Sequence, residues 1–239
     1  MNDYSSLDTT IYRFGFYCAV LLILSGFAAA FLPLDISDGL DAEHTDRIVW
    51  LTEHRATFVL GWLNQIVAML TLSGVFVAMA WQTRQRFPLT ALLSAAVVAF
   101  SVMAFIVPKF IAVWSMPLLV SAVNDPINGE MANTLLMLLN VTTPYSLFTS
   151  FDYLGFWLYA VFGLLITRPF LQGTTSSKIA GTCAGLYGAT YHILLVALLS
   201  GVLENHQIGT WFLSTTALLI IVVIATMVGF WRHGQLGSS

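Results

Sequence analysis

Three ionisable side chains lie inside long apolar stretches of the chain: Lys109, Asp152 and His192. Such residues are rare within a membrane and typically mark an ion or proton pathway, a ligand site or a buried pair. Counted at about 1.5 Å of rise per residue from the predicted cytoplasmic end of each stretch, all three fall toward the outer half of the membrane. Asn64 and Gln65 enter another stretch at a similar depth, either to hydrogen-bond between helices or to line a binding site. These five residues are the first candidates for a ligand site or a proton relay.

Each ionisable residue has two interpretations. Lys109 either extends to the outer lipid headgroups or forms an ion pair with Asp152, which neutralises both charges in a medium of low dielectric constant. His192 is either a neutral histidine bonded to a neighbour, such as Tyr191 or a backbone carbonyl, or a proton-relay residue, a ligand contact or a ligand of a metal or chromophore. Tyr191 therefore joins the candidates.

A second group of candidates lies in the polar loops: His44, His54, His206 and Glu204. Histidine and carboxylate side chains are ligands for zinc and other divalent metals. The spacings match no compact metal motif, so the alternative is a solvated acidic surface. The sequence names no cofactor.

The elements that must position these residues are six apolar stretches, each meeting the roughly 20 residues that a membrane-spanning helix needs. They are Tyr12–Leu32, Ala56–Gln82, Leu89–Val123, Leu135–Thr167, Ile179–Val202 and Thr210–Trp231. The chain is 58% hydrophobic and 9% charged, against about 25% charged residues in soluble domains. This composition predicts a polytopic membrane protein and excludes a basic face for nucleic acid.

Nearly all of the basic residues near the ends of the stretches lie on one side. They are Arg84, Arg86, Arg168, Lys178 and Arg232. The positive-inside rule places that side in the cytoplasm, and both termini with it. The N-terminus lacks the basic region of a cleavable signal, so we expect the first stretch to be retained.

The third and fourth stretches are longer than a membrane requires. As one helix, Leu89–Val123 would extend about 50 Å, against a hydrocarbon core of about 30 Å. Pro108 and Pro117 offer break points there, and Pro144 offers one in the fourth stretch. Either the two stretches project past the outer surface as a helical hairpin, which we favour, or each breaks within the membrane.

The outer loops are rich in acidic residues. Residues 33–55 carry six of them and end in an apolar segment, Ile48–Leu51, that is typical of a short interfacial helix. Together with residues of about 110–148, this loop is predicted to form an acidic outer cap. The expected fold is therefore an all-α bundle of six transmembrane helices, forming a single domain over 1–239.

Small residues open the fifth stretch, with Gly181, Gly185 and Gly188 interleaved with alanines. Glycines about one turn apart let helix backbones approach closely. They indicate either tight packing inside the bundle or a surface for dimerisation.

Several of these segments resemble a broad family of uncharacterised six-span bacterial membrane proteins. The resemblance is carried by His54-Arg55-Ala56, by Trp62-Leu63-Asn64-Gln65, by the loop Arg168-Pro169-Phe170 and by the glycine-rich start of the fifth stretch. It implies a six-helix fold in a bacterial inner membrane, with an arginine opening the second span. No catalytic residue carries over from it.

No motif for a reaction is present: G-x-S-x-G and H-E-x-x-H are both absent. The favoured function is therefore a membrane binding or accessory protein, which holds a small apolar or lipid-like ligand in the outer half of the bundle or serves as a subunit of a larger membrane complex or homo-oligomer. One alternative is a proton-coupled transporter that uses Lys109, Asp152 and His192. Another is a membrane enzyme acting on a lipid or isoprenoid, with Asp152 and His192 as acid and base.

Overall fold

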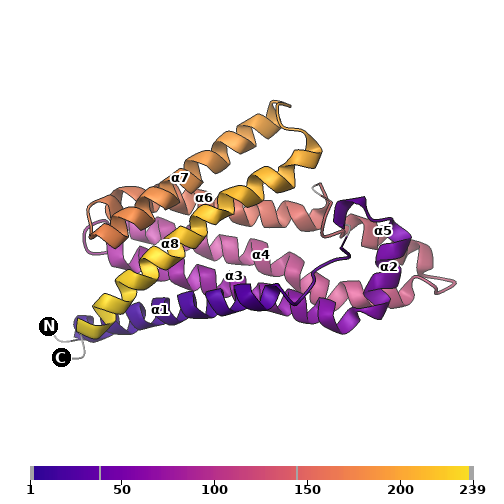
Figure 1. Cartoon of the computed structure of the whole chain (residues 1–239), viewed down its shortest axis with the longest axis horizontal. Helices are drawn as coiled ribbons and strands as arrows, with labels where there is room; N and C mark the ends of the chain where they lie inside the picture. Colours follow the sequence, from indigo (N-terminus) through magenta and orange to yellow (C-terminus); the bar gives the residue numbers. More distant parts are fainter. Residues whose placement is uncertain (1–2, 38, 144, 237–239) are drawn as a thin grey trace. The chain divides into compact units, whose positions relative to one another are not determined.

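The computed structural model describes residues 3–37, 39–143 and 145–236 (Figure 1). Over these residues the chain has eight α-helices, two short 3-10 helices and no strand, so the all-α prediction is confirmed. The α-helices are α1 (Asp3–Ala29), α2 (His44–Glu53), α3 (Arg55–Thr83), α4 (Pro88–Ala122), α5 (Gly129–Leu138), α6 (Leu147–Leu171), α7 (Thr175–Leu199) and α8 (Ile208–Leu236). The 3-10 helices are η1 (Gly39–Asp41) and η2 (Asn205–Gln207).

Six of these helices are long and apolar enough to cross a membrane. They are α1, α3, α4, α6, α7 and α8, with apolar segments of 24 to 35 residues. A segment of this length covers a hydrocarbon core of about 30 Å. The chain is thus an integral membrane protein by the length and composition of its helices.

Helix α4 runs without a break through Pro108 and Pro117. Each proline removes one backbone donor, so Pro117 donates no hydrogen bond to the carbonyl of Val113. The other bonds of this 35-residue helix keep it continuous. The alternative in which the third apolar stretch breaks at its prolines is therefore wrong.

The fourth apolar stretch, in contrast, is divided between two helices. Its predicted start at Leu135 is wrong, because Leu135 belongs to the last turn of α5, which ends at Leu138. The membrane-length helix α6 begins only at Leu147. Pro144, the predicted break point, lies outside the described residues.

Polar side chains in this connection explain the division. The Oδ1 atom of Asn140 accepts hydrogen bonds from the backbone N–H and the hydroxyl of Thr142, both at 2.9 Å. The Ser146 hydroxyl oxygen accepts from the Thr149 N–H at 3.1 Å, as an N-terminal helix cap does. These bonds give the backbone a turn and then a helix start in place of a continued helix.

The described residues divide into two compact units. Unit 1 contains residues 3–23, 70–102 and 156–236, and unit 2 contains residues 24–69 and 103–155, apart from 38 and 144. Helices α1, α3, α4 and α6 contribute residues to both units. The single domain expected from the sequence stays a prediction.

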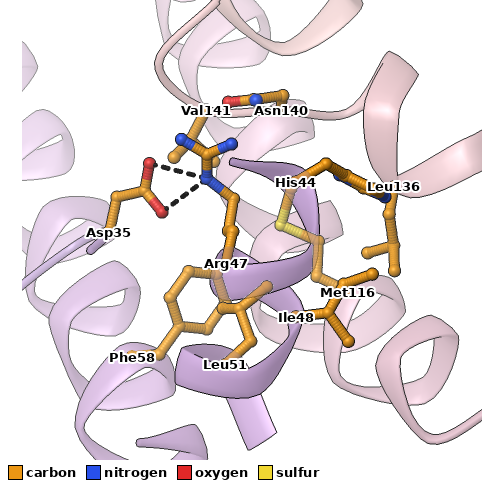
Figure 2. A pocket seen from close by; sticks show the side chains of 10 residues that line it. All are labelled: Asp35, His44, Arg47, Ile48, Leu51, Phe58, Met116, Leu136, Asn140 and Val141. Atoms are coloured by element: carbon orange, nitrogen blue, oxygen red, sulfur yellow. Dashed lines mark hydrogen bonds and ion pairs between the residues drawn. The ribbon is translucent and has the colours of Figure 1, made fainter. Parts of the chain in front are cut away.

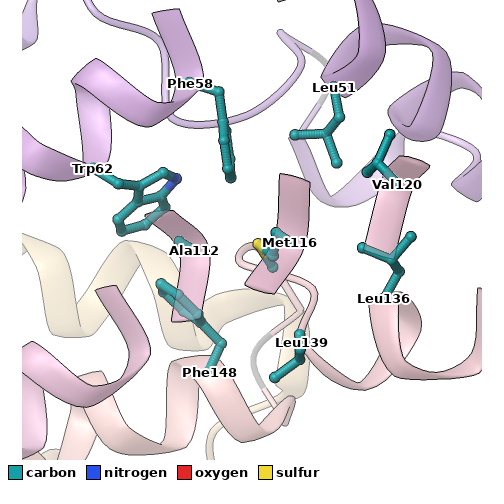
Figure 3. Packing of buried hydrophobic residues seen from close by; sticks show 9 residues of the cluster. All are labelled: Leu51, Phe58, Trp62, Ala112, Met116, Val120, Leu136, Leu139 and Phe148. Carbon is teal, nitrogen blue, oxygen red and sulfur yellow. The ribbon is translucent and has the colours of Figure 1, made fainter. Parts of the chain in front are cut away.

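Unit 2 has its own apolar core, formed by five helices and the segment after α5 (Figure 3). Trp62 of α3 packs edge-on against Phe148 of α6, with ring centroids 4.8 Å apart. The short helices α2 and α5 add Leu51 and Leu136. The remaining members are Phe58, Ala112, Met116, Val120 and Leu139. The segments that were predicted to form the cap therefore share one core.

Unit 1 is held by close contacts between α6 and α7, while α7 and α8 run side by side (Figure 1). A Cβ atom added to Gly188 of α7 would lie 2.6 Å from the Ala160 carbonyl oxygen of α6. One added to Gly185 would lie 2.5 Å from the Thr167 hydroxyl, and one on Gly181 2.7 Å from the Cβ of Phe170. The three glycines thus lie against α6 of the same chain.

These contacts predict that Gly163→Ala destabilises the protein. The new Cβ of Gly163 would meet the backbone carbonyl of Ala184 in α7, which has no side-chain freedom to move away. We expect a loss of about 1–3 kcal/mol in the free energy of unfolding, as for other overpacked sites. Titration with denaturing detergent, followed by circular dichroism, measures it.

Gly209→Ala is the matched control, because an added Cβ there meets no atom within 4 Å. It should leave stability unchanged or raise it by about 0.5–1 kcal/mol through helix propensity. Equal effects of the two substitutions would contradict close packing between α6 and α7.

Candidate functional site

A buried ion pair joins α4 and α6 within unit 2. The Lys109 Nζ lies 2.6 Å from the Asp152 Oδ1, and the two side chains are 4% and 25% exposed. The same ammonium lies 5.0 Å from the ring centroid of Phe105 and 5.9 Å from that of Trp62. A carboxylate and two aromatic rings thus compensate the positive charge where water is scarce. Lys109 is therefore paired with Asp152 in the interior of unit 2.

Asn64 makes a reciprocal contact between α1 and α3 in unit 2. Its Nδ2 donates to the Ser25 carbonyl at 2.9 Å, and the Ser25 hydroxyl donates to its Oδ1 at 2.8 Å. This arrangement is typical of polar residues that link transmembrane helices. Gln65 is half-buried on the same helix.

His192 has both ring nitrogens occupied within unit 1. Its Nδ1 lies 2.7 Å from the Gly188 carbonyl oxygen, and its Nε2 lies 3.2 Å from the Trp157 Nε1. An indole N–H only donates, so Nε2 accepts and Nδ1 carries the hydrogen. The contacts therefore engage both ring nitrogens, with the Nε2 lone pair accepting from the Trp157 indole. Neighbouring Tyr191 is buried and packs edge-on against Phe212 at 4.8 Å.

The interior of unit 1 also contains a hydrogen-bonded group that sequence reasoning missed. The hydroxyl of fully buried Tyr159 lies 2.6 Å from that of Ser73 and also bonds Ser101. Tyr187 donates to the Phe156 carbonyl at 2.9 Å. Serine and tyrosine are common in apolar helices, and their separation in sequence follows no motif, so no signal indicated this group.

The histidines of α2 point to separate neighbours. His44 begins the helix and its Nε2 lies 2.8 Å from the Oδ1 of Asn133 in α5. His54 follows the helix, stacks on Trp50 and contacts the Trp50 carbonyl through Nδ1 at 3.1 Å. Ten residues of helix separate the two histidines along the axis by about 15 Å. They do not share one metal-binding position.

His206 and Glu204, the other predicted metal ligands, form an exposed pair 3.3 Å apart in unit 1. Both side chains are 70% exposed, so the pair is solvated. Within the part of the chain that the structure describes, no group of three or more histidine, cysteine, aspartate or glutamate side chains is arranged to hold a metal ion.

Arg47 of α2 fastens the loops of unit 2 (Figure 2). Its Nε lies 3.0 and 3.1 Å from the two carboxylate oxygens of Asp35. Its guanidinium also donates to the Gly39 carbonyl and, at 3.1 Å, to the Thr142 hydroxyl. Arg47 and Asp35 are each 8% exposed. One buried arginine thus ties the loop before α2 to the connection between α5 and α6.

A small cavity adjoins this arginine, lined by polar groups of Asp35, His44, Arg47 and Asn140 and by apolar side chains (Figure 2). Its free volume of about 10 Å³ is near that of one water molecule. It has no room for an organic ligand.

The larger hollow of unit 2 is an open groove between α3 and α4, of about 740 Å³. Its wall is almost entirely apolar. Arg55, Ala56, Val59 and Leu60 of α3 face Val113, Trp114, Pro117 and Leu118 of α4. Leu60, Trp114 and Leu118 are 54%, 63% and 53% exposed. Arg55 is the only charged residue of the lining. No pattern in the sequence predicts this groove, since its two walls lie more than 50 residues apart in the chain.

Six helices long and apolar enough to cross a membrane, with internally paired polar residues, fit the class of helical membrane proteins. No protein-family model, no curated protein and no solved structure matches the chain. The family resemblance drawn from the sequence stays a prediction.

The Arg47 contacts predict a large loss of stability in unit 2 for Arg47→Met. The substitution leaves the Asp35 carboxylate buried without its partner, which costs about 3 kcal/mol or more. Hydrogen exchange measured by mass spectrometry should rise in peptides from residues 33–53 and 139–143.

The double variant Arg47→Met with Asp35→Leu is the control. It removes both charges, and we expect it to recover at least about half of the lost free energy. Strictly additive losses would mean that the two side chains do not depend on each other.

Proposed function

We propose that the protein binds a lipid-like molecule in the groove between α3 and α4, as a binding or accessory protein of the membrane. The groove is the observation that carries this proposal. Its volume of about 740 Å³ lies within the usual range of ligand sites, about 300–1,000 Å³. Its apolar lining suits a hydrocarbon chain, and its open side suits a ligand that enters from the bilayer.

The contacts of the intramembrane polar residues are those that a packed helical bundle needs, so the proposed binding function requires no further role for these residues. Asp152 is bonded to Lys109, and both nitrogens of His192 are engaged. These contacts link neighbouring helices, which is a structural role.

We also infer an orientation: the termini lie in the cytoplasm of a bacterium, and residues 33–55 with about 110–148 form the acidic cap on the outer side of its inner membrane. The distribution of basic residues supports this orientation. The turn after α4 adds an acidic tip, where the backbone N–H groups of Ile127 and Asn128 lower the pKa of Asp125. Asp125 therefore stays charged at neutral pH, which suits a turn in water.

Cysteine accessibility tests the orientation. In a variant without the native cysteines, Asn124→Cys and Ser200→Cys should react with a membrane-impermeant maleimide in spheroplasts. Gln85→Cys and Gln172→Cys should react only after lysis. All four sites are exposed in the structure. The opposite labelling pattern would invert the proposed orientation.

Filling the groove tests the proposed function. Ala56→Phe places a ring in the groove and should lower the occupancy of co-purified lipid about tenfold, as for a loss of about 1.4 kcal/mol. Native mass spectrometry of the protein in mild detergent measures the occupancy. Circular dichroism checks that the variant remains folded.

Ala96→Phe, at an exposed alanine of α4 that does not line the groove, is the control and should leave lipid occupancy unchanged. Lipid-free wild-type protein, or equal occupancy in both variants, would overturn the groove as a lipid site. A partner chain in the same spectra would instead favour the subunit of a larger complex.

A further inference from the structure

We propose that the occupant of the groove is an anionic phospholipid, with its phosphate at Arg55 and an acyl chain along Val59 and Leu60. The inference rests on the proposed function and specifies the class of lipid. It follows from the charges of unit 2 and from the order of the groove residues along α3.

Arg55 is the one uncompensated basic side chain of unit 2. This unit contains three lysine or arginine residues. Arg47 is paired with Asp35, and Lys109 with Asp152. Arg55 is exposed and forms no hydrogen bond or ion pair with any residue that the structure describes. Its charge is therefore available to an external anion.

The guanidinium stands at one end of an apolar wall. Arg55 is the first residue of α3, and the other α3 residues of the groove follow at one, four and five positions beyond it. Leu60 therefore lies about 7.5 Å farther along the helix axis. An arginine followed by an apolar surface matches an amphiphile with an anionic head and a hydrocarbon tail, and the planar guanidinium binds phosphate oxygens in pairs.

Trp114 on the opposite wall fits the same level of the membrane. It is 63% exposed and stacks with Phe110, with ring centroids 6.2 Å apart and planes within 7°. Exposed tryptophans concentrate where lipid headgroups meet hydrocarbon. Because Trp114 lies across the groove from Arg55, the boundary between the head and the tail of the lipid is expected at the level of these two side chains.

We expect Glu53 to limit the negative charge of the lipid head that binds at this end of the groove. It lies two residues before Arg55 and is exposed, and it forms no ion pair among the described residues. A nearby negative charge disfavours a second negative charge on the ligand. We therefore choose dioleoylphosphatidylglycerol, with one negative charge, as the probe.

The test is competition between two lipids that differ only in the head. Full-length protein, stripped of lipid in mild detergent, is titrated with equal amounts of dioleoylphosphatidylglycerol and dioleoylphosphatidylcholine, and native mass spectrometry counts each bound species. Wild type should prefer phosphatidylglycerol about fivefold, the effect of one partly exposed charged contact. Arg55→Gln should bind the two lipids equally, and Glu53→Gln should increase the preference for phosphatidylglycerol.

Arg86→Gln, in the loop beyond the other end of α3, is the matched control and should keep the preference. Equal binding of both lipids to wild type would overturn the anionic head while leaving the proposed function intact. A preference that survives Arg55→Gln would place the anion elsewhere and overturn the inference. Binding of inorganic phosphate alone at Arg55, or of a second copy of the chain in place of lipid, would also overturn it. Absence of any retained lipid, in contrast, would remove the proposed function itself.

Discussion

The cost of an uncompensated polar group in hydrocarbon governs this structure. A charge or hydrogen-bonding group that leaves water must find a partner nearby or it destabilises the fold. Lys109 meets this requirement through Asp152 and two aromatic rings, and His192 through Trp157 and a backbone carbonyl. Asn64 meets it through Ser25. The ionisable and amide side chains that were the first candidates for a functional site thus join neighbouring helices.

The two units obtain their packing in different ways. In unit 1, glycines let α6 and α7 approach until backbone meets backbone, which is how helices associate where lipid is as apolar as the side chains. Unit 2 adds two short helices, and it packs large aromatic side chains such as Phe58 and Trp62 into a core with Leu51 and Leu136. Arg47 then anchors its loops. This core leaves the outward faces of α3 and α4 uncovered.

A binding site is expected where a charged side chain has no partner within the fold. The only lysine or arginine of unit 2 without a partner among the described residues is Arg55, and it lies at the end of the apolar groove. A charge that the fold does not use and a surface that the fold does not cover form one amphipathic site. The proposed phospholipid would satisfy both at once, because its head would supply the counter-charge and its tail the contact area.

The helical class, the six membrane-length helices and the residues that need partners can all be predicted from the amino-acid sequence alone. These follow from local properties: the length of an apolar run and the cost of a charge within it. The folded chain was needed to show that α4 continues through Pro117, that Ser146 starts a new helix, and that Arg47 pairs with Asp35. It also placed Val59 opposite Trp114 in one groove. The reason is physical: partners depend on the rotation and offset of packed helices, which come from side-chain contacts between segments distant in the chain.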